Sequence, residues 1–198
     1  LYSGFKKEVA KFSNPLKLIS IGRISAIKQT GKSVSILELL LSQKEASLTI
    51  VGDGITSSDF EYKNYLKQQI TKSNLSNRVN LIGYVEPDRI PSFVANSDIL
   101  IHTSNTGSMD KVVLEALLAG TLVLSESDAF ASSLNELGMF ISGGSISEYV
   151  KRIMFFINNP DKLKYSVENG RKWVVNNHDI RNLFSAIKKN YEEIITGK

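Results

Sequence analysis

Cysteine is absent from the 198-residue sequence, and histidine occurs only twice. Without cysteine the chain has no disulfide framework, thiol nucleophile or cysteine metal cluster. His102 and His178 lie far apart in different local patterns, so we expect no zinc site. No motif around either histidine joins it to a carboxylate and a nucleophile, so we interpret both as structural. The sequence therefore predicts neither a cysteine metal cluster nor a histidine zinc site.

Long apolar runs are also missing. Runs such as residues 116–119 and 153–157 are far shorter than the roughly 20 residues that cross a bilayer. The first residues do not combine a basic stretch with an apolar signal core, so secretion is not expected. These absences predict a cytoplasmic protein without a transmembrane segment.

The positive charge is small and unevenly placed. The chain has 24 Lys+Arg against 20 Asp+Glu, a net charge of +4. Residues 1–17 hold four lysines and one glutamate, which accounts for +3 of that charge. No basic stripe with interleaved aromatics is present, so we expect no nucleic-acid partner. The chain begins with Leu1 instead of methionine, and we expect it to be a piece of a longer protein.

Two hydrophobic periodicities alternate along the chain. Short β-branched or leucine-rich runs, typical of strands buried on both faces, are separated by segments with helical spacing. This alternation predicts an α/β fold: a Rossmann-like, doubly wound parallel sheet of about six strands with helices on both faces. The predicted strands cover residues 16–21, 47–51, 79–82, 99–102, 121–124 and 139–141; the predicted helices cover residues 34–41, 62–73, 90–95, 112–119, 146–157, 161–175 and 180–195.

The domain organisation follows from the same pattern. We expect residues 1–15 to be a linker segment, residues 16–177 to form the Rossmann-like domain, and residues 178–198 to form a C-terminal helix. In such a sheet, ligands bind beyond the carboxyl ends of the strands, so the loops at those ends are the first candidates for a site.

The loop after the first strand contains Gly22, Arg23, Lys28 and Lys32. Cations and glycines between a strand and a helix suit an anionic ligand, because a helix N-terminus offers free N–H groups. A solvated loop with surface lysines is the alternative interpretation.

Residues 26–33 also come close to the phosphate-binding pattern G-x-x-x-x-G-K-[ST], with Ala26 in place of the first glycine. Lys32 and Ser33 would then bind phosphate, and Asp53 would mimic the acidic strand end that holds magnesium. Three residues separate Gly22 from Ala26, whereas that loop turns directly off its strand. A P-loop nucleotide hydrolase is therefore an alternative function.

The next two loops carry weaker signals. Residues 51–54 begin like the dinucleotide fingerprint G-x-G-x-x-G, but Ser57 replaces the last glycine and the motif belongs after the first strand. Tyr84 follows the third strand, where it either stacks on a nucleobase or packs within its loop.

The loop after the fourth strand is the richest in small and polar residues. Asp110 lies at a predicted helix N-cap, which leaves backbone amides exposed for a phosphate. Glu115 lies within an otherwise apolar helical turn, where an uncompensated buried carboxylate costs on the order of several kcal/mol. It therefore needs a partner, either a ligand hydroxyl or a nearby lysine at the helix edge.

Four short motifs occur in order on these strands: G-R-x4-K, V-G-D-G, N-R-V-x-L-x-G and S-x10-E-A-x3-G. Together they resemble the C-terminal domain of family-4 (group 1) retaining glycosyltransferases, which have the GT-B architecture of two Rossmann-like domains across a cleft. The resemblance runs from about Leu16 to Asn177. It implies that this domain binds the nucleoside-diphosphate-sugar donor, without a metal cofactor, and that a missing N-terminal domain binds an acceptor glycan or glycolipid. It also implies that residues 178–198 pack toward that missing domain, and that the missing half allows association with the inner face of a membrane.

The resemblance assigns roles to individual residues. Arg23 and Lys28 match the basic pair that neutralises the donor diphosphate. Glu115 matches the glutamate that binds the ribose hydroxyls. The remaining predicted donor contacts are Gly22 beside the diphosphate, Gly83 and Tyr84 at the base, and Ser108, Lys111, Val112, Val113 and Leu114 at the sugar and phosphates.

One position departs from the family pattern. The first glutamate of the usual E-x7-E is Gly107 here, and the usual glycine-aromatic-glycine is Ser108-Met109-Asp110. Asp110 is the carboxylate that we expect to act in its place, and the donor sugar stays unassigned. A non-catalytic nucleotide-sugar-binding module and a sugar-nucleotide epimerase are further alternatives.

Overall fold

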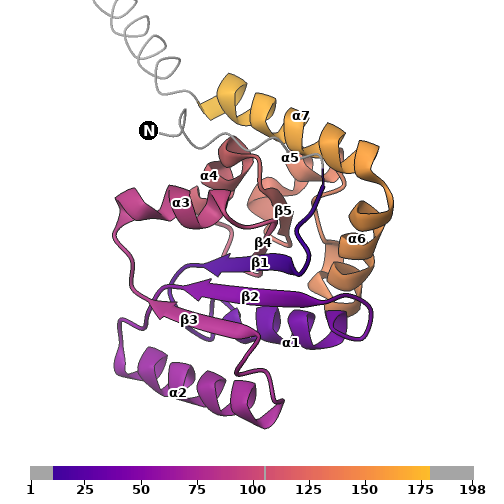
Figure 1. Ribbon diagram of the computed structural model, residues 1–198. Coiled ribbons are helices and arrows are strands. Elements are labelled where there is room, and N and C mark those ends of the chain that lie inside the picture. The colour runs from indigo at the N-terminus through magenta and orange to yellow at the C-terminus, as the bar shows by residue number, and fades with distance from the viewer. Residues whose placement is uncertain (1–10, 105, 179–198) are drawn as a thin grey trace, which may run out of the picture.

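The chain forms a five-stranded parallel sheet with the order β3-β2-β1-β4-β5 in a computed structural model that describes residues 11–104 and 106–178 (Figure 1). The order reverses between β1 and β4, so a topological switch point lies between these two strands. The strands are β1 (Leu16–Ile21), β2 (Ala46–Val51), β3 (Val79–Gly83), β4 (Ile99–His102) and β5 (Leu122–Ser125).

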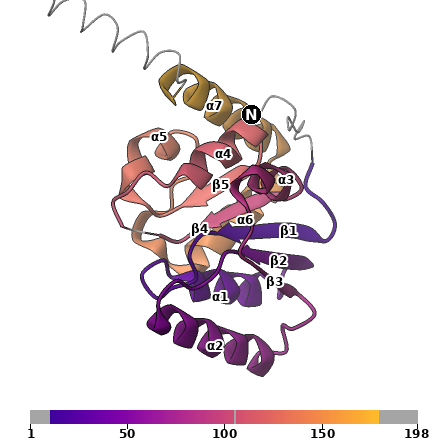
Figure 2. The same cartoon turned by 90° about the vertical axis from the view of Figure 1, so that its left-hand side faces the viewer.

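Helices cover both faces of the sheet (Figures 1 and 2). Helices α1 and α2 lie on one face, where α1 packs against α6; on the other face α4 packs against α3 and α7. The helices are α1 (Thr30–Leu40), α2 (Ser57–Lys72), α3 (Ile90–Ala95), α4 (Lys111–Ala119), α5 (Ala131–Asn135), α6 (Ile146–Asn158) and α7 (Pro160–His178), with short 3-10 helices η1 (Pro87–Arg89), η2 (Asp128–Phe130) and η3 (Ser142–Gly144).

The apolar runs of the sequence explain the central strands. All four residues of β4 and all four of β5 are buried, as expected for strands between two helical layers. Gly120 ends α4 in the left-handed conformation that favours glycine, so β5 can begin two residues later. The doubly wound parallel fold predicted from the sequence is confirmed.

The predicted sixth strand at residues 139–141 is wrong. Phe140 forms a single parallel bridge with Ser125, and no longer ladder follows among the described residues. The N–H groups of Met139 and Phe140 donate instead to the carbonyl of Leu134 at 2.9 and 3.3 Å. These bonds close the turn after α5, and the segment joins β5 through the two hydrogen bonds of the bridge: Ser125 N–H to the Met139 carbonyl at 3.1 Å and Ile141 N–H to the Ser125 carbonyl at 2.8 Å.

Helix α2 begins five residues earlier than its apolar spacing predicts. Thr56 is the N-cap: its hydroxyl accepts from the Asp59 N–H, and the Asp59 carboxylate accepts from the Thr56 N–H. This capping box fixes the helix start through polar residues, which the apolar pattern does not register.

The two ends of the domain assignment are only partly described. Residues 1–10 of the predicted linker lie outside the described residues, and so do residues 179–198 of the predicted final helix. Within the described part of the linker, Ser13 donates to the Asp98 carboxylate through its N–H and its hydroxyl, both at 3.2 Å. Among the helices of the described segments, none is long and apolar enough to span a bilayer.

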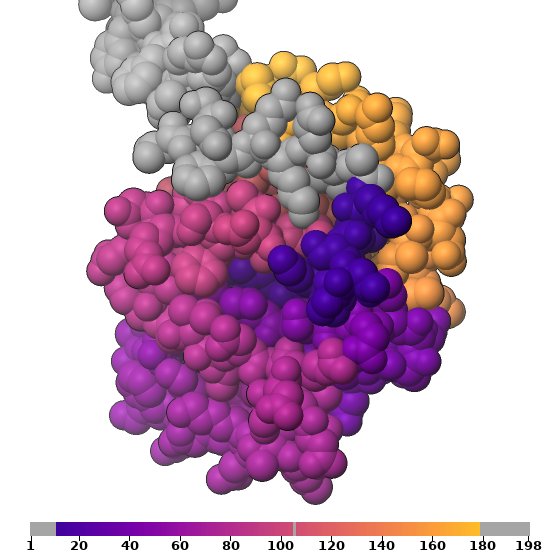
Figure 3. Space-filling model, in the orientation of Figure 1, coloured from indigo at the N-terminus to yellow at the C-terminus, as the bar shows by residue number. Residues whose placement is uncertain are grey.

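A groove of about 450 Å³ lies on the sheet face opposite α1 and α2. Figure 3 shows the molecule hollowed between α3 and the segment that enters β1. Outward-facing residues of β1 to β3, including Lys17, Thr49 and Asn80, line it. The groove is thus separate from the carboxyl edge of the sheet.

Gly22 and Gly52 allow a test of how closely the chain after β1 approaches the chain after β2 at the carboxyl edge of the sheet. Both have φ near +140°, at 146° and 135°, where side chains are strained by about 1–3 kcal/mol. A Cβ on Gly52 would meet the Gly22 carbonyl oxygen at 1.9 Å, whereas a Cβ on Gly22 meets nothing within 4 Å. We expect Gly52→Ala to destabilise the fold by more than about 3 kcal/mol and Gly22→Ala by about 1–2 kcal/mol, measured by chemical denaturation. Equal losses would contradict the close approach.

Candidate functional site

A cavity of about 270 Å³ opens at the carboxyl ends of β1 and β4, at the switch point of the sheet. It combines the loop after β1 with the end of β4 and the start of α4. Its lining residues are Ser20, Ile21, Gly22, Arg23, Lys28, Thr30, Ile101, His102, Thr103, Ser104, Asp110, Lys111 and Val112.

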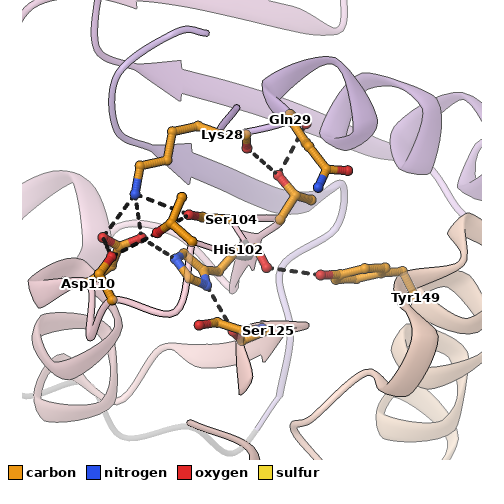
Figure 4. A network of polar contacts seen from close by, with 11 residues as sticks. Lys28, Gln29, His102, Ser104, Asp110, Ser125 and Tyr149 are labelled. Carbon is orange, nitrogen blue, oxygen red and sulfur yellow. Dashed lines mark hydrogen bonds and ion pairs between the residues drawn. The ribbon is translucent and has the colours of Figure 1, made fainter. Parts of the chain in front are cut away.

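The loop after β1 is fastened to the end of β4 by Thr103. Its hydroxyl lies 3.1 Å from the carbonyl oxygen of Lys28 and 3.2 Å from that of Gln29, and it donates to this pair (Figure 4). Gln29 has a φ of 51°, so the chain turns sharply before α1 begins at Thr30. This turn aims the side chain of Lys28 into the cavity.

The Lys28 ammonium contacts two side chains. Its Nζ lies 3.0 Å from Oδ1 and 2.9 Å from Oδ2 of Asp110, and 3.0 Å from the Ser104 hydroxyl. Lys28 therefore donates to both oxygens of one carboxylate and to one hydroxyl. The ion pair joins the loop after β1 to the loop after β4.

His102 holds the other side of Asp110 (Figure 4). Its Nε2 lies 2.8 Å from Asp110 Oδ2 and its Nδ1 lies 2.8 Å from the Ser125 hydroxyl; the side chain is 5% exposed. An ionised carboxylate only accepts hydrogen bonds, so Nε2 carries a proton. When the ring is neutral, Nδ1 therefore accepts from Ser125.

These contacts shift the ionisation of Asp110. Hydrogen bonds from His102 and Lys28 hold the pKa of the Asp110 carboxyl well below its usual range, although partial burial acts in the opposite direction. Asp110 is therefore an anion throughout the physiological pH range. Nearby, burial raises the pKa of Tyr149, whose hydroxyl donates to the His102 carbonyl at 2.9 Å.

Asp110 occupies the N-cap position of α4, as predicted, but its side chain does not cap the helix. Its carboxylate turns toward Lys28 and His102. Ser108, another predicted donor contact, is exposed and donates to Asp110 Oδ1 at 3.3 Å. The N-terminus of α4 is thus left without a side-chain cap from Asp110 at the rim of the cavity.

Arg23 and Gly22 also line the cavity. The Arg23 side chain is 38% exposed, and its Nε lies 3.9 Å from the Asp59 carboxylate, a distance too long for a hydrogen bond. Arg23 can therefore turn toward an anion in the cavity without breaking a short contact.

The start of α4 is divided between the cavity and the core. Lys111 and Val112 line the cavity, whereas Val113 is fully buried in the core and Leu114 packs against it. Glu115 is 7% exposed, and its Oε1 lies 3.1 Å from Nζ of Lys111. Of the two partners considered for Glu115, a ligand hydroxyl and a lysine at the helix edge, the structure shows the lysine, Lys111, one helical turn away.

Gly83 and Tyr84 lie at the same edge of the sheet but do not line this cavity. Tyr84 is 67% exposed, and its hydroxyl donates to Glu86 at 3.1 Å. That hydrogen bond raises the pKa of Tyr84. Its ring is available for stacking at the outer rim.

The residues of the P-loop alternative do not come together. Nζ of Lys32 lies 2.6 Å from Oε2 of Glu126, in a second cavity of about 480 Å³. Ser33 is fully buried and donates to the Thr30 carbonyl, while Asp53 pairs with Lys63 at 2.6 Å. Lys28 lines the cavity at the switch point, whereas Lys32 does not. Within the described segments, no cluster of three or more His, Asp or Glu side chains could hold a metal ion.

The sequence indicates a structural role for His102 but does not predict its contact with the Asp110 carboxylate. It also does not predict Thr103 and Ser104 as the groups that hold Lys28 in place. All three residues end β4 or follow it directly. The rule that ligands bind at the carboxyl ends of strands could have indicated them, but only the fold shows that Asp110 returns to meet them.

The family model of glycosyl transferases group 1 matches residues 4–173. With its Rossmann-like sheet and polar cavity at the switch point, the chain belongs to this family. Among curated relatives, 2-deoxystreptamine glucosyltransferase of Streptomyces kanamyceticus is 21% identical over 179 residues, covering 88% of this chain and 45% of that protein. The chain thus spans about half the length of the curated relatives it matches first.

Solved structures show the same fold. HepE of Anabaena, in complex with UDP and glucose, has a TM-score of 0.74 at 23% identity, covering 90% of this chain and 48% of that one. The C-terminal domain of a group 1 glycosyl transferase (LpcC) from Francisella tularensis has a TM-score of 0.71 at 19% identity, covering 88% of this chain and 98% of that one. The fold is therefore that of the C-terminal domain in GT-B glycosyltransferases.

Asp110→Asn tests the electrostatics of the cavity through stability. A depressed pKa in the folded state stabilises the protein above the unfolded-state pKa of 3.8, and this contribution is lost as pH falls below it. We expect the difference in free energy of unfolding between the wild type and Asp110→Asn to shrink from about pH 6 to about pH 3, measured by urea denaturation. A difference that stays constant over this range would show that the carboxylate is not stabilised in the fold.

Proposed function

We propose that this chain is the donor-binding half of a retaining glycosyltransferase, which transfers a sugar from a nucleoside-diphosphate sugar to a hydroxyl acceptor. The observation that carries the proposal is the approach of two cations, Arg23 and Lys28, to one cavity at the switch point between β1 and β4. Membership of the group 1 family and the UDP bound in a structural neighbour support it. Polysaccharide, lipopolysaccharide or glycolipid synthesis is the process that suits such a transfer.

Lys28 and Arg23 would neutralise the donor diphosphate. As the glycosidic bond breaks, negative charge grows on the leaving nucleoside diphosphate, and cations held at that position stabilise the transition state. The uncapped N–H groups at the start of α4 would add to this field, because a helix N-terminus attracts anions. With these groups present we expect donor binding to need no metal ion.

The sugar would be transferred with retained anomeric configuration. In this reading the leaving diphosphate itself takes the proton of the acceptor hydroxyl on the same face of the sugar, as in the family-4 enzymes that the sequence resembles. Within the cavity Asp110 is held by Lys28 and His102, so it is engaged with the phosphate-binding lysine and is not poised as a free nucleophile. This engagement supports a reaction without a covalent intermediate on Asp110.

The acceptor would bind to a second domain across the carboxyl edge of the sheet. Four large apolar side chains are exposed in the four loops that follow β1 to β4, an arrangement that favours contact with another surface. These residues are Ile27, Ile55, Tyr84 and Met109. We place the protein in the cytoplasm, with the second domain free to associate with the inner face of a membrane.

Lys28→Ala is the direct test of donor binding. We expect the chain to bind UDP-glucose, and Lys28→Ala to weaken binding at least about tenfold, because the variant loses a cation and leaves Asp110 facing the diphosphate. Titration calorimetry or NMR titration, with and without magnesium, measures the effect.

Two variants serve as controls for this test. Lys44→Ala removes the same charge just before β2, at the opposite edge of the sheet, and should bind like the wild type. Lys32→Gln separates the P-loop alternative: loss of binding only in this variant, together with dependence on magnesium, would overturn the assignment of Lys28. Circular dichroism checks that each variant is folded.

The stereochemistry is tested on the longer protein that carries this domain. A screen of hydroxyl acceptors with UDP-glucose identifies an active pair, and proton NMR of the first product gives its anomeric configuration. We expect the α configuration of the donor to be retained. A β product would contradict the proposed same-face mechanism and leave donor binding unaffected.

A further inference from the structure

The ion pair of Lys28 with Asp110 stands in the way of the ligand that Lys28 would bind. The Lys28 ammonium donates to both oxygens of the Asp110 carboxylate, at 2.9 and 3.0 Å, and to the Ser104 hydroxyl at 3.0 Å. A phosphate group that binds Lys28 competes with this carboxylate for the same positive charge. Asp110 therefore acts as an internal anion that competes with a diphosphate for this lysine.

Asp110 cannot simply leave when a diphosphate arrives. Its Oδ2 is held at 2.8 Å by His102, whose ring is almost fully buried and fixed on its far side by Ser125. After Lys28 turned to the diphosphate, the carboxylate would remain on His102 beside a second anion. Like charges in one cavity disfavour each other unless a positive charge compensates them.

His102 is the group that can supply this charge. Histidine is the side chain that changes its charge between about pH 5 and 8. We propose that binding of the nucleoside-diphosphate sugar is coupled to uptake of one proton by His102, which turns the His102–Asp110 pair neutral as Lys28 is transferred from Asp110 to the diphosphate. This inference rests on the proposed function and adds a regulatory step to it.

The hydrogen-bond partners of His102 accommodate both protonation states. In the neutral ring Nε2–H donates to Asp110 and Nδ1 accepts from the Ser125 hydroxyl. In the imidazolium the added proton sits on Nδ1 and donates to the same hydroxyl, which rotates its own hydrogen away. A serine hydroxyl has one donor and two lone pairs, so its oxygen can accept from Nδ1–H as well as from the Ser127 N–H at 3.1 Å.

The charged groups around His102 favour this site for the proton. The anion closest to its ring is Asp110, while Glu126, which begins the loop after β5, is paired with Lys32 at 2.6 Å. The groups that face His102 or share its cavity are Asp110 before α4, Lys28 and Arg23 after β1, Lys111 on α4, Ser125 and Glu126 at the end of β5, the Phe130 ring edge of η2 and the Tyr149 hydroxyl of α6.

Titration calorimetry with UDP-glucose tests the coupling. In UDP-glucose one phosphate is esterified to uridine and the other to glucose. Each phosphate therefore has only a strongly acidic group, and the ligand itself takes up no proton near neutral pH. The measured enthalpy is compared in HEPES, MOPS and Tris at about pH 7.5. The slope against buffer ionisation enthalpy gives the protons bound, and we expect uptake approaching one per UDP-glucose.

Three variants assign the proton. His102→Gln keeps an amide donor for Asp110 but takes no proton, so uptake should vanish and affinity should fall about tenfold, within the usual range of coupling between two ligands. Asp110→Asn removes the competing anion, so uptake should also vanish while affinity rises. His178→Gln is the matched control, because His178 is the other histidine of the chain and is exposed at the end of α7, and it should keep the wild-type uptake.

The outcomes separate the two proposals. Binding of UDP-glucose without proton uptake, or uptake that persists in His102→Gln, overturns the coupling and leaves the proposed function standing. Absence of binding in the wild type with UDP-glucose, GDP-glucose and ADP-glucose alike overturns the proposed function and the coupling with it. Weaker binding by Asp110→Asn would show that the carboxylate assists the donor and does not compete with it, which also overturns the inference.

Discussion

The contact between Lys28 and Asp110 determines how the carboxyl edge of this domain is arranged. It joins the loops that leave β1 and β4, the two strands at which the sheet order reverses. At a switch point the neighbouring loops run to opposite faces of the sheet, which opens a space between them. Thr103 anchors one loop through the Lys28 carbonyl, and His102 anchors the other through Asp110, so the cavity has fixed walls on both sides.

This ion pair is better understood as an orienting device than as a source of stability. Both side chains are about one quarter exposed, and ion pairs with access to solvent contribute little net free energy because desolvation and lost side-chain freedom offset the Coulomb attraction. The main effect of the ion pair between Lys28 and Asp110 is to fix the positions of the two side chains. The Lys28 ammonium is held at the cavity, where it is paired with the singly charged carboxylate of Asp110. A diphosphate carries two charges and can displace a single carboxylate.

The sequence predicts the sheet, its switch point and most of the cavity, because these features follow from local patterns. Apolar runs mark the strands, and the cations Arg23 and Lys28 follow the first of them directly. What it does not predict depends on contacts between distant segments. The segment at residues 139–141 has the apolar composition of a strand, yet two of its N–H groups donate to the Leu134 carbonyl and it forms a single bridge with β5. His102 lacks a nearby motif because its partners are Asp110 and Ser125, which only the folded sheet brings to the ring.

Asp110 has two effects at the start of α4: its carboxylate pairs with Lys28, and it leaves the helix N-terminus without a side-chain cap. A carboxylate at an N-cap position ordinarily accepts from the first backbone N–H groups and so neutralises the helix end. Here the stronger donors, Lys28 and His102, hold the carboxylate away from the helix. Lys28 carries a full positive charge, whereas the backbone N–H groups at the helix end carry only partial charges, so the carboxylate pairs with the lysine. The same side chain therefore occupies the lysine and leaves the helix N-terminus open. The cavity therefore offers an anion two features side by side: a helix N-terminus that Asp110 does not cap and a lysine that Asp110 pairs with.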